Sequence, residues 1–102
     1  MPRHIAVASM SDVPPGACLS VEADGISIAL CNLNGKVYAL DNTCPHAGGP
    51  LGEGTLDGDC VVCPWHGWRY QVYTGARPEN PDFKVDCFPV SIEGESIIVE
   101  LP

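Results

Sequence analysis

The chain has 102 residues, a length that accommodates one domain and excludes two. Thirteen acidic residues against five basic ones give a formal net charge of −8. This charge disfavours binding to nucleic-acid phosphates and favours a partner with a basic surface. No run of about 18 apolar residues is present, so no membrane span is expected. The N-terminal segment lacks the apolar core of a secretory signal, and we therefore expect a cytoplasmic protein.

The predicted elements are short strands. Gly (11) and Pro (10) together make up about a fifth of the chain, which is typical of many strands and turns. No segment carries an amphipathic 3.6-residue period over ten or more residues. The segments with strand character are, in chain order, Ile5–Ala8, Cys18–Glu22, Ile26–Cys31, Lys36–Leu40, Phe88–Ile92 and Ser96–Leu101. The first of these is expected at a sheet edge.

Three turns connect these strands. Asp24-Gly25 and Asn34-Gly35 are strong hairpin signals, and residues 93–95 (EGE) separate the last two segments. Such closely spaced turns predict an all-β fold, an antiparallel sandwich or small barrel. Residues 43–82 differ from the rest, because they hold both Trp, five of the ten Pro and two of the three His. We interpret them as a sheet-and-loop subdomain inserted into one domain that spans residues 1–102.

Two similar phrases in this subdomain carry the chemistry, CPH at 44–46 and CPWH at 63–66. They place Cys44, His46, Cys63 and His66 in the pattern C-x-H-x16-C-x2-H. The sixteen intervening residues suffice for a turn and two short strands, so the two loops can return side by side. Each loop would then present a thiol and an imidazole to one metal centre.

Two metal centres compete for these ligands. Zinc with two Cys and two His would be tetrahedral, but its sites usually pair Cys with Cys and His with His. A [2Fe–2S] cluster with two Cys on one iron and two His on the other suits mixed loops, because each loop can then touch both irons.

The two phrases resemble those of Rieske-type [2Fe–2S] proteins, and at this length the chain resembles a free-standing Rieske ferredoxin. Flanking stretches at 35–40 (GKVYAL), 54–58 (GTLDG) and 74–75 (TG) extend the resemblance from residue 12 to residue 101. The resemblance implies one cluster per chain. It also implies that Cys44 and Cys63 bind the inner iron, and that His46 and His66 bind the outer iron near the surface.

This family resemblance implies a monomeric one-electron carrier between a flavoprotein reductase and a terminal oxygenase. A second possibility is the Rieske-type small subunit of an assimilatory nitrite reductase, whose partner would be the large subunit. A zinc-stabilised interaction module is the alternative from another class. An oxygenase itself is excluded, because its mononuclear iron needs two further His and a carboxylate, and only His4 remains. We therefore expect no catalytic residue.

Respiratory Rieske proteins are similar in both loops but add a disulfide, at positions that match Gly49 and Trp65 here. They also place a Ser hydroxyl where this chain has Trp68, whereas Tyr70 matches a family Tyr that donates to a cysteine sulfur. The resemblance therefore implies a low potential within the class range of roughly −150 to +300 mV.

The neighbouring residues each admit a structural interpretation beside a functional one. Trp65 and Trp68 are loop packing, or a shield and docking surface. The glycines at 48, 49 and 67 serve turns, or bring backbone N–H groups close to sulfur. Pro78 and Pro81 stiffen a loop, or belong to a third loop over the cluster.

The remaining candidates are expected to have structural roles only. Arg69 and Arg77 are expected to be solvated, and His4 is expected to bind nothing. The other cysteines lie in or beside apolar strand segments, where reduced thiols behave as small hydrophobic groups; they are Cys18, Cys31, Cys60 and Cys87. We expect no disulfide among them in a cytosolic chain.

Overall fold

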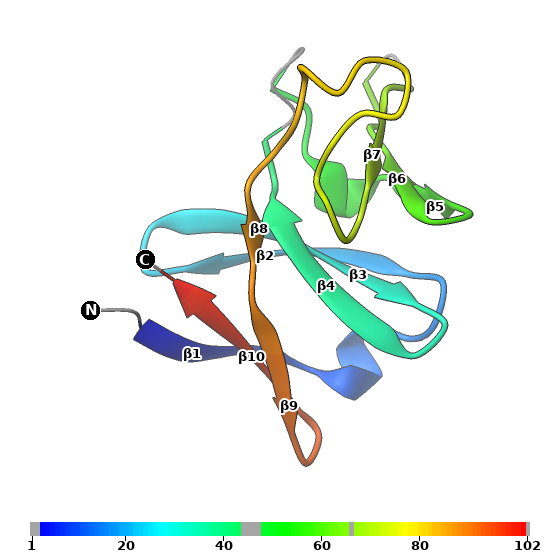
Figure 1. The fold of residues 1–102 in the computed structure, drawn as a ribbon. Coiled ribbons are helices and arrows are strands. Elements are labelled where there is room, and N and C mark those ends of the chain that lie inside the picture. The colour runs from blue at the N-terminus through cyan, green and yellow to red at the C-terminus, as the bar shows by residue number, and fades with distance from the viewer. Residues whose placement is uncertain (1–2, 44–47, 66, 102) are drawn as a thin grey trace.

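The computed structural model describes residues 3–43, 48–65 and 67–101. These residues form strands and two short 3₁₀ helices, with no α-helix among them (Figure 1). The elements are β1 (Arg3–Ser9), η1 (Met10–Asp12), β2 (Cys18–Ala23), β3 (Ile26–Leu33), β4 (Lys36–Asp41), η2 (Leu51–Glu53), β5 (Thr55–Asp57), β6 (Cys60–Val62), β7 (Arg69–Gln71), β8 (Cys87–Phe88), β9 (Val90–Glu93) and β10 (Ser96–Leu101). Within the described ranges, no helix has the length and apolar character to cross a bilayer.

Two antiparallel sheets pack on a common core. The first sheet has the order β1-β10-β9 and the second the order β2-β3-β4-β8. The sandwich core between them is built from Val13, Ala23, Ile28, Leu30, Val37, Ala39, Ile97, Val99 and Leu101. The predicted all-β sandwich is therefore confirmed, and β1 lies at a sheet edge as expected.

The two predicted hairpins form where the turn residues require. Asp24 and Gly25 both have positive φ (54° and 80°), as do Asn34 and Gly35 (55° and 96°). Two successive left-handed residues match the right-handed twist of the flanking strands, and Asn-Gly and Asp-Gly tolerate them best. The turns therefore set the register of β2 against β3 and of β3 against β4.

The predicted strand Phe88–Ile92 is wrong as a single element, because the chain divides at Pro89. Phe88 in β8 pairs with Ala39 of the second sheet, whereas Val90 in β9 pairs with Val99 of the first sheet. Proline has no N–H to donate to a ladder, and the Pro89 carbonyl accepts a bond from the Glu100 N–H at 2.9 Å. The chain therefore crosses from the second sheet to the first sheet at Pro89.

A third sheet, β5-β6-β7, comes between β4 and β8 in the chain and lies above the second sheet (Figure 1). A second core lies beneath it; this loop core comprises Ala29, Cys31, Leu40, Leu51, Val61, Cys63, Tyr70, Val72 and Val85. Successive residues of a strand point to opposite faces, so β3 and β4 supply both cores. The apolar run of β3 thus reflects burial on two faces.

Candidate metal centre

Cys63 is the one predicted ligand within the described ranges; Cys44, His46 and His66 lie outside them. Cys63 follows directly on β6, and its side chain is only 1 % exposed. It belongs to the loop core beside Leu51 and Tyr70. The third sheet therefore holds this thiol at the inner side of the loop region.

Backbone N–H groups of residues 63, 65 and 67 form hydrogen bonds around Cys63. The Cys63 N–H donates to the Trp68 carbonyl at 2.7 Å, and the Gly67 N–H donates to the Cys63 carbonyl at 3.2 Å. Gly67 has a φ of +74°, which glycine adopts without strain. The turn directs the Trp65 N–H onto the Cys63 sulfur at 3.4 Å. Such a bond stabilises a thiolate, the form in which cysteine binds metals.

Gly49 brings the first loop into contact with the second. A Cβ at residue 49 would lie 2.7 Å from the Cys63 sulfur and 3.0 Å from Cγ of Trp65. The predicted return of the two loops to one place is thus observed for their described residues. Gly49 therefore allows the two loops to approach each other closely. Gly49 and Trp65, the positions matching the respiratory disulfide, are neighbours here.

A buried asparagine, which sequence reasoning missed, closes the base of the first loop. Asn42 accepts the Gly52 N–H at 2.7 Å through its side-chain oxygen and the Leu51 N–H at 2.8 Å through its carbonyl. Its amide nitrogen donates to the Ser27 hydroxyl at 3.0 Å. A polar residue directly after an apolar strand was the available signal, because a buried amide has to be satisfied.

Residues 76–84 form a third loop that packs on the second. The Arg77 guanidinium lies 3.7 Å from the centre of the Trp68 ring, and Phe83 meets the same ring edge-on at 5.1 Å. Arg69 donates to Glu79 at 2.8 Å and to Asp57 at 3.2 Å. The side chain of Arg69 is exposed, as expected for a solvated residue, and its carboxylate partners lie at the surface. The expectation is wrong for Arg77, whose planar cation stacks on Trp68.

The two tryptophans have different roles. Trp68 is partly buried against the loop core and the third loop, in keeping with the packing interpretation. Trp65 is 50 % exposed and, with Phe83, is one of the large apolar side chains at the surface. Trp65 is therefore a candidate contact surface, because it is an exposed apolar side chain in the loop that carries Cys63.

His4, expected to be without function, pairs with Glu100 across β1 and β10.

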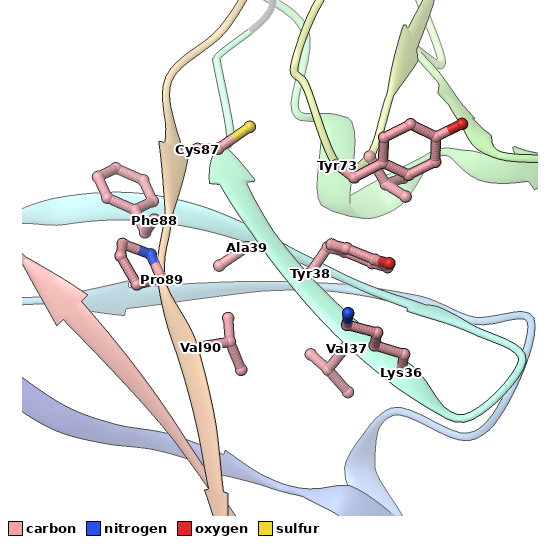
Figure 2. Close-up of a pocket in the computed structure, with 10 residues that line it drawn as sticks. Lys36, Val37, Tyr38, Ala39, Tyr73, Cys87, Phe88, Pro89 and Val90 are labelled. Carbon is pink, nitrogen blue, oxygen red and sulfur yellow. The ribbon is translucent and has the colours of Figure 1, made fainter.

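A pocket of about 320 Å³ lies elsewhere, between β4 and the β8–β9 segment (Figure 2). Tyr38, Tyr73 and Cys87 contribute to its lining, together with the side chain of Lys36. None of the described loop residues, at 48–50, 63–65 and 67–68, lines it. The pocket is therefore separate from the described residues of the two loops.

The described part of the loops fits a metal cluster. The buried Cys63 sulfur accepts a hydrogen bond from the Trp65 N–H. Gly49 of the first loop lies so close to this sulfur that a Cβ on residue 49 would collide with it. The sequence profile of the Rieske [2Fe–2S] domain matches residues 3–89. The chain belongs to this family. Its cofactor is one [2Fe–2S] cluster.

Individual relatives of this Rieske domain cover nearly its whole length. The ferredoxin component of a naphthalene 1,2-dioxygenase system of Pseudomonas aeruginosa is 33 % identical over 102 residues, 97 % of this chain and 96 % of the relative. The structure of a complex of reduced oxygenase and oxidised ferredoxin in carbazole 1,9a-dioxygenase matches with a TM-score of 0.84. There the identity is 33 %, over 94 % of this chain and 91 % of the matched one.

A putative nitrite reductase small subunit from Mycobacterium tuberculosis has a TM-score of 0.91, over 100 % of this chain and 97 % of that one. Its identity to this chain is 21 %, which shows a shared fold only.

The described cysteines are free thiols, namely Cys18, Cys31, Cys60, Cys63 and Cys87. All of these except Cys63 lie in strands, as the sequence predicted.

Proposed function

We propose that this protein is a Rieske ferredoxin that carries single electrons from a flavoprotein reductase to a terminal oxygenase. The observation that carries the proposal is the 33 % identity, over 97 % of the chain, with the ferredoxin component of a dioxygenase system. The oxygenase as electron acceptor is favoured over a nitrite reductase large subunit, because the nitrite reductase relative shares only the fold.

The proposed ligands are Cys44 and Cys63 for one iron and His46 and His66 for the other. When bound, a cluster of this kind accepts and releases one electron, and imidazole in place of thiolate raises its potential. The side chain of Cys63 is buried from solvent, and the hydrogen bond from the Trp65 N–H stabilises the negative charge of its thiolate. We assign residues 43–82 as the cluster-binding subdomain.

The proposed docking surface surrounds Trp65. This side chain lies between Cys63 and His66 in sequence and is half exposed, so it flanks the proposed ligands of the second loop. Interfaces concentrate aromatic side chains at their centres. The net charge of −8 favours a partner with a basic surface. The contact belongs to the small, transient class typical of redox pairs, under about 1,200 Å². We infer a monomer that works in the cytoplasm.

Two measurements test this proposal. The electron paramagnetic resonance spectrum of the dithionite-reduced protein should be the rhombic signal of a mixed nitrogen- and sulfur-ligated [2Fe–2S] cluster. A colourless protein that holds zinc would refute the cofactor. Reduced protein should then be mixed with the oxygenase of a naphthalene dioxygenase system or with a nitrite reductase large subunit. Faster reoxidation by the oxygenase is expected, and faster reoxidation by the nitrite reductase would assign the protein to that system.

A further inference from the structure

Cys18 and Cys31 lie directly opposite one another on neighbouring strands of the second sheet. Cys18 begins β2 and is the register partner of Cys31 in β3. The Asn32 N–H donates to the Ala17 carbonyl at 3.0 Å and the Asn32 carbonyl accepts the Gly16 N–H at 2.8 Å. Hydrogen-bonded and non-hydrogen-bonded pairs alternate along an antiparallel ladder, so the next pair, Cys18 with Cys31, is of the non-hydrogen-bonded kind.

This kind of pair brings two side chains close. Its Cα atoms lie about 4.5 Å apart, inside the range of about 4.4–6.8 Å that a disulfide spans. Both side chains are on the face of the second sheet that meets the loop core, because Cys31 belongs to that core and Cys18 packs against it. The two sulfurs therefore face each other on one side of the sheet.

The two thiols differ in their access to solvent. Cys31 is fully buried, whereas Cys18 is partly exposed on β2, which forms the edge of its sheet. A hydrogen bond from the Cys31 thiol lowers the pKa of Cys18, and the same bond, together with burial, raises the pKa of Cys31. The accessible member of the pair is thus the one that more readily becomes a thiolate, the nucleophilic form.

We propose that Cys18 and Cys31 form a reversible disulfide when the protein meets a low-molecular-weight disulfide such as oxidised glutathione. The Cys18 thiolate attacks one glutathione sulfur, forms a mixed disulfide and releases one glutathione thiolate. The Cys31 sulfur then attacks Cys18 and releases the second glutathione. Two electrons pass to the glutathione disulfide, and the two thiol protons end on two glutathione molecules. The inference is independent of the proposed electron-carrier function.

The sheet makes this crosslink a labile one. Opposed Cβ atoms in a sheet lie about 4.5–5.5 Å apart, farther than the mean of about 3.8 Å in disulfides. Closing the bond draws the strands together, and strained disulfides are the more easily reduced ones. The bond would tie down β2, and Ser20 of β2 contacts Gly52 beside the first loop. It is a redox modification next to the base of the cluster-binding loops.

The other strand cysteines offer matched controls. Cys60 is opposite Gln71 and Asp57 in the third sheet, and Cys87 is opposite Leu40 in the second. Neither has a described cysteine as its register partner. The exposed Cys87 is the stricter control, because oxidised glutathione reaches it and its register partner, Leu40, has no thiol to close a bond.

The test treats the cluster-loaded protein with excess oxidised glutathione without oxygen, blocks remaining thiols with N-ethylmaleimide and measures the intact mass. The expected product has lost two hydrogen atoms and carries two fewer N-ethylmaleimide groups than protein that was not treated with glutathione. Cleavage after Glu22, which separates the two cysteines, should leave both halves joined until dithiothreitol is added. The visible spectrum of the cluster is followed throughout, so loss of the cluster is distinguished from crosslinking.

Cys18→Ser should abolish the crosslink and Cys87→Ser should leave it unchanged. Cys18 is the residue to substitute first, because it is less buried than Cys31 and its variant is the safer one to fold. A stable glutathione adduct on Cys18 of the parent protein, with no crosslink, would overturn the proposal. Unreacted thiols at both positions, or a crosslink that survives in Cys18→Ser, would overturn it equally.

Discussion

Gly49 lies against the sulfur of Cys63, so close that a Cβ on residue 49 would be 2.7 Å from it. The glycine belongs to the first loop and the cysteine to the second, separated by fourteen positions in the sequence. The contact depends on how both loops are held. The side chain of Asn42 closes the base of the first loop, and Cys63 follows directly on β6.

Gly49→Ala should therefore reduce cluster content. The added methyl group collides with the buried sulfur of Cys63, a proposed ligand, and such overpacking costs about 1–3 kcal/mol. Iron per chain and visible absorption of the purified protein measure the effect. Gly58→Ala is the matched control: residue 58 has open space around it, so its cost is the backbone strain of its +62° φ alone. Equal iron content in the two variants would contradict the close approach.

His46→Ala or His66→Ala should abolish the normal cluster, because the outer iron would lose an imidazole ligand. His4→Ala should keep the cluster, since His4 is exposed and pairs with Glu100. Visible and electron paramagnetic resonance spectra of the three variants provide the comparison. A parental spectrum from the His66→Ala protein would refute the ligand assignment.

Trp65→Ala should slow electron transfer to the oxygenase by about tenfold, the effect of removing a central aromatic from an interface. The donor to Cys63 is the backbone N–H of Trp65, so it survives the substitution and the iron content should stay close to that of the parent. Ile92→Ala in β9 removes a side chain of similar exposure, 45 % against 50 %, outside the proposed surface. If the two variants transfer electrons equally well, the surface is misplaced.

The rate of electron transfer should fall as salt is added. The net charge of −8 steers the protein towards a basic partner, and salt of about 0.1 M already screens charges beyond about 10 Å. Stopped-flow mixing with the oxygenase at increasing ionic strength measures the dependence. A rate that does not change with salt would remove electrostatic steering from the account.

The Arg69–Glu79 pair should stabilise the protein at neutral pH and lose its effect in acid. The hydrogen bond from Arg69 holds the pKa of Glu79 below its ordinary 4.5. A carboxylate with a lowered folded-state pKa contributes fully above the unfolded-state value, and its contribution disappears as the pH falls through the folded-state value. Urea unfolding of parent, Arg69→Met, Glu79→Gln and the double variant should give a coupling at pH 7 that shrinks near pH 3. A coupling that is the same at both pH values would contradict the pairing.

The local features of this protein follow from the sequence by itself. Asn34-Gly35 and Asp24-Gly25 predict their hairpins because few other residues accept two positive φ values in succession. The Cys and His spacing in the two loops predicts a metal centre, because ligand type and order are chemical properties of the residues themselves, and the resemblance to Rieske proteins indicates which centre it is. The six predicted strand segments all contain strand, with only the Phe88–Ile92 segment divided.

Only the tertiary structure decided the features that join distant parts of the chain. The division at Pro89 depends on which sheet each flanking residue meets, and the stack of Arg77 on Trp68 depends on where the third loop returns. The pairing of Cys18 with Cys31 follows from the register of two strands. Spacing along a sequence restricts such contacts without selecting among them, because the selection is made by packing around the two cores, where residues far apart in the chain fill one space.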